Sequence, residues 1–127
     1  MFNTKNTKQQ GNIGIGQALA YFTGLKWTVS IPLNDSQDYD LIVDDGSTLH
    51  RVQVKTTKYV TKSGSYQAML KTCGGNQSWT GVSKKFDNTS VEILFVLCEN
   101  GDMYCMPTKD LNVTSTINLS KYPQYKI

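Results

Sequence analysis

The stretch "YDLIVDDGSTLHRVQVKTT", residues 39–57, decides the fold of this 127-residue chain. Two runs rich in Val, Ile, Leu and Thr flank the tetrapeptide DDGS, and the pair Asp45-Gly46 is typical of a tight turn. The sequence therefore predicts a β-hairpin. In its second strand, side chains two residues apart share a face, so Gln53 and Lys55 project to the same side.

The segments around this hairpin predict an α/β domain with a mixed central sheet flanked by helices. Apolar residues three and four apart predict an amphipathic helix over residues 13–24, preceded by a flexible arm over residues 1–10. The run "VEILFVL" is the most apolar of the chain and predicts a central strand. Other expected elements are strands at 27–33, 65–72 and 98–107 and a short helix at 107–111.

Length and composition indicate a single globular domain over residues 1–127, with 39% hydrophobic and 18% charged residues. No apolar run approaches the roughly 18 residues of a membrane span, and the first residues do not resemble a secretory signal. Three cysteines without CxxC spacing predict free thiols in a reducing compartment. We therefore expect a cytoplasmic protein without a membrane partner.

The charges are unevenly distributed along the chain, although the net charge is only +3. Five of the ten acidic residues lie between positions 35 and 45, and residues 51–86 contain basic residues but no acidic ones. This layout predicts a polyanion-binding surface beside a cation-binding centre, or else a solvated basic face without special purpose. Trp79 fits either a contact with a DNA groove or a plain surface loop. The expected phosphate contacts are Arg51, Lys58, Lys62, Lys71, Lys84 and Lys85.

Pairing across the hairpin turn should bring Asp40 alongside residues 50–53, close to Gln53 and Lys55. Phosphodiester hydrolysis uses a divalent cation such as Mg²⁺ held by a carboxylate, and a lysine can orient water or offset developing charge. We therefore identify Asp40, Gln53 and Lys55 as candidate catalytic residues, with Asp40 and Gln53 as metal ligands. The alternative is that Asp40 caps a turn and that the other two form a solvated strand face.

The order Asp40, hairpin, Gln53, Val54, Lys55 resembles the signature of the PD-(D/E)xK nucleases, in which an acid precedes a hairpin bearing an acid or amide, any residue, and lysine. The glutamine variant resembles a subgroup that includes a homing endonuclease of group I introns, and more distantly the Holliday-junction resolvases. The resemblance implies a restriction-endonuclease-like core of helix, three-stranded meander, helix and strand. It also implies cleavage of double-stranded or branched DNA with Mg²⁺, or alternatively Mn²⁺, by a homodimer or homotetramer.

One departure from this family pattern concerns the first helix. The family often has a glutamate three residues before an alanine that matches Ala18, and this chain has Ile15 there. Gln17 is the nearest polar residue, but it lies about 200° around the helix from Ile15. Asp38 is the other candidate for an accessory role. With carboxylates absent at positions 15 and 53, four interpretations stay open: a site-specific endonuclease, a junction-resolving nuclease, a DNA-binding module with weakened chemistry, and a protein-interaction domain in which the basic stretch is incidental.

Overall fold

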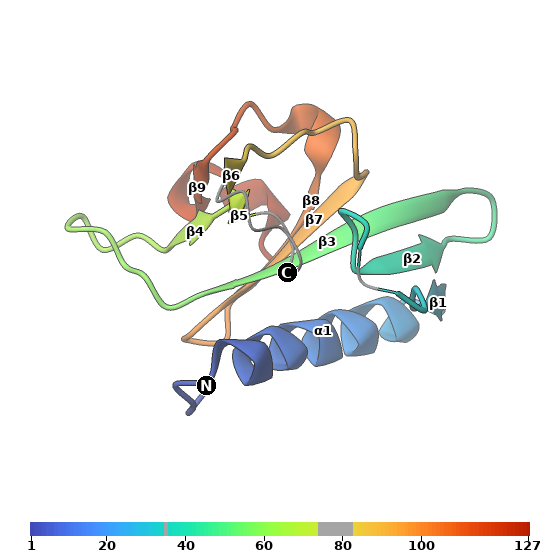
Figure 1. The fold of residues 1–127 in the computed structure, drawn as a ribbon, viewed down its shortest axis with the longest axis horizontal. Helices are drawn as coiled ribbons and strands as arrows, with labels where there is room; N and C mark the ends of the chain where they lie inside the picture. Colours follow the sequence, from blue (N-terminus) through green and yellow to red (C-terminus); the bar gives the residue numbers. More distant parts are fainter. Residues whose placement is uncertain (35, 74–82) are drawn as a thin grey trace.

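The computed structural model describes residues 1–34, 36–73 and 83–127 and contains a five-stranded mixed sheet in the order β1-β2-β3-β7-β8 (Figure 1). Its strands are β1 (Thr28–Ser30), β2 (Leu41–Asp44), β3 (Leu49–Thr57), β7 (Ile93–Cys98) and β8 (Met103–Pro107). The β3–β7 pair is parallel, and the other three pairs are antiparallel. The expected mixed α/β sheet is confirmed, with the predicted apolar run as its buried strand β7.

The β2–β3 hairpin forms as the turn chemistry predicts. Leu41 pairs with Val52 and Asp44 pairs with Leu49. The carboxylate of Asp45 accepts the backbone N–H of Thr48 at 2.8 Å, and Gly46 adopts a φ of +100°. A residue with a Cβ rarely adopts this φ, so glycine is the residue that allows the chain to reverse here.

Helix α1 (Thr7–Gly24) covers one face of the sheet and begins six residues before the predicted start at residue 13 (Figure 1). The reason is an N-cap: the side chain of Asn6 accepts the backbone N–H groups of Lys8 and Gln9, at 2.9 and 3.2 Å. The expected flexible arm over residues 1–10 is also not what the structure shows. Its last four residues are helical, and Phe2 is only 3% exposed.

The opposite face of the sheet is covered by short strands and 3-10 helices (Figure 1). Strand β4 (Gln67–Met69) pairs with β9 (Thr116–Asn118), and β5 (Thr72–Cys73) pairs with β6 (Ser83–Lys84). The 3-10 helices are η1 (Thr108–Asp110), η2 (Leu119–Lys121) and η3 (Pro123–Tyr125). Between β3 and β7, the described residues 58–73 and 83–92 form no α-helix, whereas the resemblance implies one there.

Two apolar cores result, one on each face of the sheet. The first lies between α1 and the sheet and includes Ala18, Phe22 and Val52. The second lies under β4 and β9 and includes Leu94, Met106 and Ile117. Within the described part of the chain, no helix has the length and apolar character that crossing a membrane requires.

Gly14 allows α1 to approach β3 closely, and this contact generates a stability prediction. A Cβ at Gly14 would meet Thr56 Cγ2 at 2.6 Å and Val54 Cγ1 at 3.2 Å. The Thr56 side chain has little freedom to move, because its Oγ1 accepts a hydrogen bond from Gln10 Nε2 at 2.8 Å. We expect Gly14→Ala to lower the free energy of unfolding by about 1–3 kcal/mol in urea denaturation.

Gly16→Ala is the matched control, because Gly16 lies in the same helix and a Cβ there meets nothing within 4 Å. Alanine is favoured over glycine in a helix, so this variant should be stabilised by about 0.5–1 kcal/mol. Equal stability changes in the two variants would contradict the close approach of α1 to β3.

Candidate active site

Asp40 lies directly before β2 and is held against the middle of β3 by two hydrogen bonds. Its backbone N–H donates to the carbonyl oxygen of Val52 at 2.8 Å. Its carboxylate oxygen Oδ2 accepts the backbone N–H of Val54 at 2.7 Å. The pairing of β2 and β3 therefore places Asp40 beside the segment that contains Gln53, close to where the hairpin pattern predicts it.

Asp40 and Lys55 are both half-buried and near enough for each charge to affect the other, but they form no direct ion pair among the described residues. Burial raises the pKa of Asp40, and the Val54 N–H and the charge of Lys55 only partly oppose this effect. Burial likewise lowers the pKa of Lys55, partly opposed by the charge of Asp40. Each charge is thus destabilised by desolvation and stabilised by the other. Opposed shifts of this kind are typical of functional sites, although structural ion pairs also produce them.

The backbone of Val54 adds an oxygen that the sequence motif did not identify. In an extended strand, the N–H and C=O groups of one residue point to the same side of the strand. Because the Val54 N–H points to Asp40, its carbonyl oxygen also faces the Asp40 side of β3. Strand geometry could have indicated this group, but only after the hairpin register was known.

These donors fit a hard divalent cation of the Mg²⁺ type, which prefers carboxylate, carbonyl and water oxygens. Within the described residues, no three His, Cys, Asp or Glu side chains lie close enough together to hold a metal ion. A cation beside Asp40 would therefore depend on one carboxylate, neutral carbonyl oxygens, water and substrate phosphate. Magnesium sites with one or two carboxylates and substrate phosphates follow this pattern.

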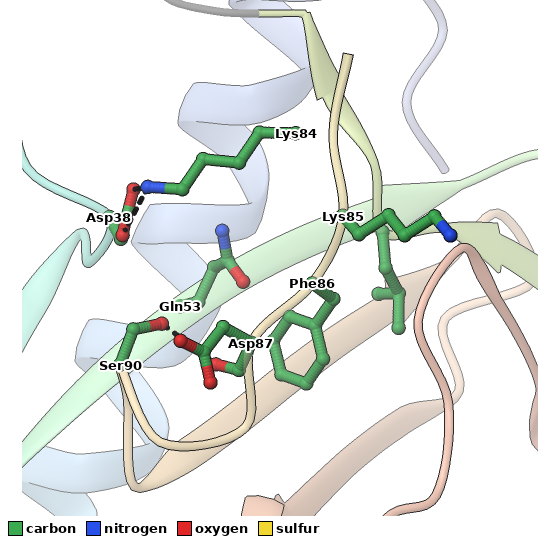
Figure 2. Close-up of a pocket in the computed structure, with 8 residues that line it drawn as sticks. Asp38, Gln53, Lys84, Lys85, Phe86, Asp87 and Ser90 are labelled. Atoms are coloured by element: carbon green, nitrogen blue, oxygen red, sulfur yellow. Dashed lines mark hydrogen bonds and ion pairs between the residues drawn. The ribbon is translucent and has the colours of Figure 1, made fainter.

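Gln53 is 9% exposed and faces a small pocket next to this site. Figure 2 shows its amide pointing into the pocket, between the pair formed by Asp38 and Lys84 and the side chain of Asp87. The cavity measures about 10 Å³, the room of about one water molecule. Gln53 thus borders two features, the Asp40–Lys55 site and this pocket.

Asp38, the expected accessory acid, forms an ion pair with Lys84. Its two carboxylate oxygens accept hydrogen bonds from Lys84 Nζ at 2.9 and 2.8 Å. Its carboxylate lines the Gln53 pocket, but its charge is balanced by Lys84. A metal-binding role for Asp38 would require that ion pair to open.

Helix α1 supplies no carboxylate, because it contains neither Asp nor Glu. Ile15 packs against the apolar cluster between α1 and the sheet, so this position serves the core. Gln17 is half-buried, on the same helix. The polar group that α1 does direct at β3 is the amide of Gln10, through its hydrogen bond to Thr56.

The basic residues expected to contact phosphate differ in their environments. The Nε of Arg51 donates to both carboxylate oxygens of Glu92 at 3.1 Å, and the backbone N–H of Arg51 donates to Oε1 at 2.9 Å. Lys58 Nζ donates to the carbonyl oxygen of Thr4 at 2.6 Å. Lys84 binds Asp38. Lys62, Lys71 and Lys85 are exposed, and Trp79 lies outside the described residues.

The desolvated Asp40–Lys55 pair generates a stability prediction. In Asp40→Asn/Lys55→Met, both charges are absent and the asparagine oxygen can still accept the Val54 N–H. Because removing two partly desolvated opposite charges together is often neutral or stabilising, we expect the unfolding free energy in urea to stay unchanged or rise by about 1–4 kcal/mol. Lys55→Met alone should be less stable than the double variant, since it leaves the half-buried Asp40 carboxylate without its nearby counter-charge.

The control is Asp38→Asn/Lys84→Met, which removes an exposed ion pair and should change stability by no more than about 1 kcal/mol. A large loss of stability in Asp40→Asn/Lys55→Met would show that the Asp40–Lys55 pair serves the fold.

Comparisons with known proteins identify the family and the fold of this chain. The family model described as PD-(D/E)XK endonuclease matches residues 5–125. Among solved structures, a bacterial homing endonuclease, I-Ssp6803I, is similar with a TM-score of 0.72 and 24% sequence identity. The match covers 90% of this chain and 78% of that one, which confirms the expected mixed α/β fold, although the described residues lack the α-helix that the resemblance implies between β3 and β7. No curated protein matches the chain. The family model spans nearly the whole sequence, and the chain therefore belongs to the PD-(D/E)XK endonuclease family.

Proposed function

We propose that this protein is a Mg²⁺-dependent endonuclease that hydrolyses phosphodiester bonds in double-stranded DNA inside the cell, at specific sites. The observation that carries the proposal is the desolvated Asp40–Lys55 pair, aligned on β3 by the Val54 N–H. A half-buried carboxylate with an ammonium nearby is suited to bind a cation and a negatively charged substrate. Membership of an endonuclease family supports the same reaction class.

In this proposal each residue has a distinct task. The Asp40 carboxylate and the Val54 carbonyl oxygen would hold the cation, and the Gln53 amide oxygen would assist more weakly because it is neutral. A bound Mg²⁺ ion would supply a water of lowered pKa and polarisation of the phosphate. The Lys55 ammonium orients the attacking water or offsets negative charge that develops on the phosphate.

Recognition of a site along a duplex would require more than one copy of this small chain. We therefore propose a homodimer or homotetramer, in which repeated copies contact successive parts of the target. The exposed Lys62, Lys71 and Lys85 are suited to phosphate contacts. Manganese is a plausible substitute metal, because it also accepts oxygen ligands.

A junction-resolving nuclease is the second candidate, since the same site can serve a branched substrate. A third is a DNA-binding module with weakened chemistry, which is favoured by the apolar Ile15 and the neutral Gln53. The substrate panel below separates these candidates.

The central test measures cleavage of linear duplex, supercoiled plasmid and four-way junction with Mg²⁺ or Mn²⁺. We expect Lys55→Ala and Asp40→Asn each to reduce the cleavage rate by about 10²-fold or more, because each removes a charge that acts on the reacting phosphate. Lys109→Ala, which removes an exposed lysine on η1, is the control and should cleave at the wild-type rate.

Cleavage of the junction alone would favour the resolving nuclease. Binding without cleavage by the wild-type protein would favour the DNA-binding module. Wild-type rates in Lys55→Ala would show that the active site lies elsewhere.

A second test asks whether Gln53 is a metal ligand. Gln53→Glu adds a ligand charge with almost no change in shape, and ligand charge tunes cation affinity. We expect the Mg²⁺ concentration for half-maximal cleavage to fall by about tenfold, which corresponds to about 1.4 kcal/mol. Gln124→Glu adds the same charge at an exposed position near the C-terminus and should leave the Mg²⁺ requirement unchanged. The same Mg²⁺ requirement in both variants would remove Gln53 from the metal site.

A further inference from the structure

The two-stranded β4–β9 ribbon presents uncharged polar and apolar side chains on its outer face. Ala68 pairs with Ile117, and both are completely buried in the core beneath the ribbon. Because side chains alternate along a strand, the neighbouring residues project the other way. Met69 is 69% exposed and pairs with Thr116, which is also exposed. Gln67 is half-buried and donates from Nε2 to Thr116 Oγ1 at 3.2 Å.

These side chains line an open groove of about 510 Å³ that begins one residue beyond Lys55. Gln10 of α1 borders the groove on one side, the ribbon borders it on the other, and residues 56–59 at the end of β3 form its floor. In Figure 1, the β4–β9 ribbon and α1 lie on opposite sides of the C-terminal half of β3. Thr57 shares the face of β3 with Lys55 and lines the groove, so a substrate that continues from Lys55 along β3 would reach it.

The ribbon is fixed rigidly to the strand that carries the proposed catalytic residues. Thr57, which is 5% exposed, donates from Oγ1 to the carbonyl oxygen of Gln67 at 2.6 Å. The backbone N–H of Gln67 donates to the carbonyl oxygen of Tyr59 at 3.1 Å. Elements held in this way can read a substrate at a constant distance from the reacting phosphate.

The chemistry of the ribbon matches base edges better than phosphates. Among the described residues that line the groove, Lys58 is the only charged one, and its Nζ donates to the carbonyl oxygen of Thr4. A glutamine amide can bind adenine through two hydrogen bonds in the major groove, and an apolar side chain can contact the methyl group of thymine. A two-stranded ribbon is also an element that the major groove admits. The exposed Lys71 follows β4 closely and could contact the adjacent backbone.

We propose that the β4–β9 ribbon reads base-pair edges in the major groove of duplex DNA beside the cut, through Gln67, Met69 and Thr116. This inference rests on the proposed endonuclease function and assigns its sequence specificity to a particular surface. The hydrogen bond from Gln67 to Thr116 orients the amide, and Met69 supplies the apolar contact.

The test selects bound sequences from a pool of randomised DNA duplexes, in EDTA and again with Ca²⁺, so that binding is measured apart from cleavage. The wild-type protein should enrich a defined sequence. In Gln67→Ala, Met69→Ala and Thr116→Ala, we expect discrimination at one to three base pairs to fall by about 5- to 100-fold, the range for a lost base contact of about 1–3 kcal/mol. The salt dependence of binding should be unchanged, whereas Lys71→Ala should weaken binding to all sequences and reduce its salt slope by about 1.

Two matched controls lie away from the ribbon, in the edge strand β1 and in the segment after it. Thr28→Ala alters another exposed threonine at the start of a three-residue strand, and Leu33→Ala alters another exposed apolar side chain. Both should enrich the wild-type sequence. The inference is overturned if the ribbon variants enrich the wild-type sequence too, or if they weaken binding to all sequences equally with a reduced salt slope.

Cleavage assays on the same proteins separate this inference from the proposed function. Altered enrichment in the ribbon variants, together with no cleavage by the wild-type protein, would support the ribbon and reject the nuclease. Wild-type cleavage with unaltered enrichment in the ribbon variants would reject the ribbon and retain the nuclease.

Discussion

The hydrogen bond from the Val54 N–H to the Asp40 carboxylate is the interaction on which the site depends. The ladder between β2 and β3 ends at the pair Leu41–Val52. The next N–H of β3 that points toward β2 belongs to Val54, and no residue of β2 lies opposite it. A backbone N–H in such a place needs an acceptor, and the Asp40 side chain provides one at 2.7 Å. The same hydrogen bond places the Asp40 carboxylate near Lys55. One interaction therefore both satisfies the backbone N–H of Val54 and positions the candidate catalytic acid.

The two faces of β3 differ in role: one packs against α1, and the other carries the candidate site residues Gln53 and Lys55. Val52 is buried against α1, where Gly14 permits a close approach to β3. On the opposite face Gln53 and Lys55 project, with Leu94 and Val96 of β7 as their register partners. The charges of Lys55 and of the nearby Asp40 are unfavourable in this partly buried setting unless each offsets the other. We propose that this arrangement serves chemistry at some expense in stability, as the double variant Asp40→Asn/Lys55→Met would test.

The position of a basic residue in the fold decides what its charge can do. Arg51 stands two residues from Gln53 and looks like part of a substrate surface in the sequence, but Glu92 binds both its guanidinium and its backbone. This contact links β3 to the residue just before β7 and thereby supports the parallel pair at the centre of the sheet. Lys84 similarly neutralises Asp38 beside the Gln53 pocket.

The amino-acid sequence by itself determined the local features: the β2–β3 hairpin, the central strand β7, and the approach of Asp40 to the predicted residues 50–53, where the structure places it beside Val52 and Val54. Turn chemistry and the two-residue period of strands act over short distances, so they can be recognised without the rest of the molecule. The extent of α1 was underestimated, because a polar first turn capped by Asn6 carries no apolar periodicity. Only the tertiary structure decided the partners of Arg51 and Asp38, which lie 41 and 46 positions away. It also brought together β4 and β9, since pairing between distant short strands depends on the core beneath them.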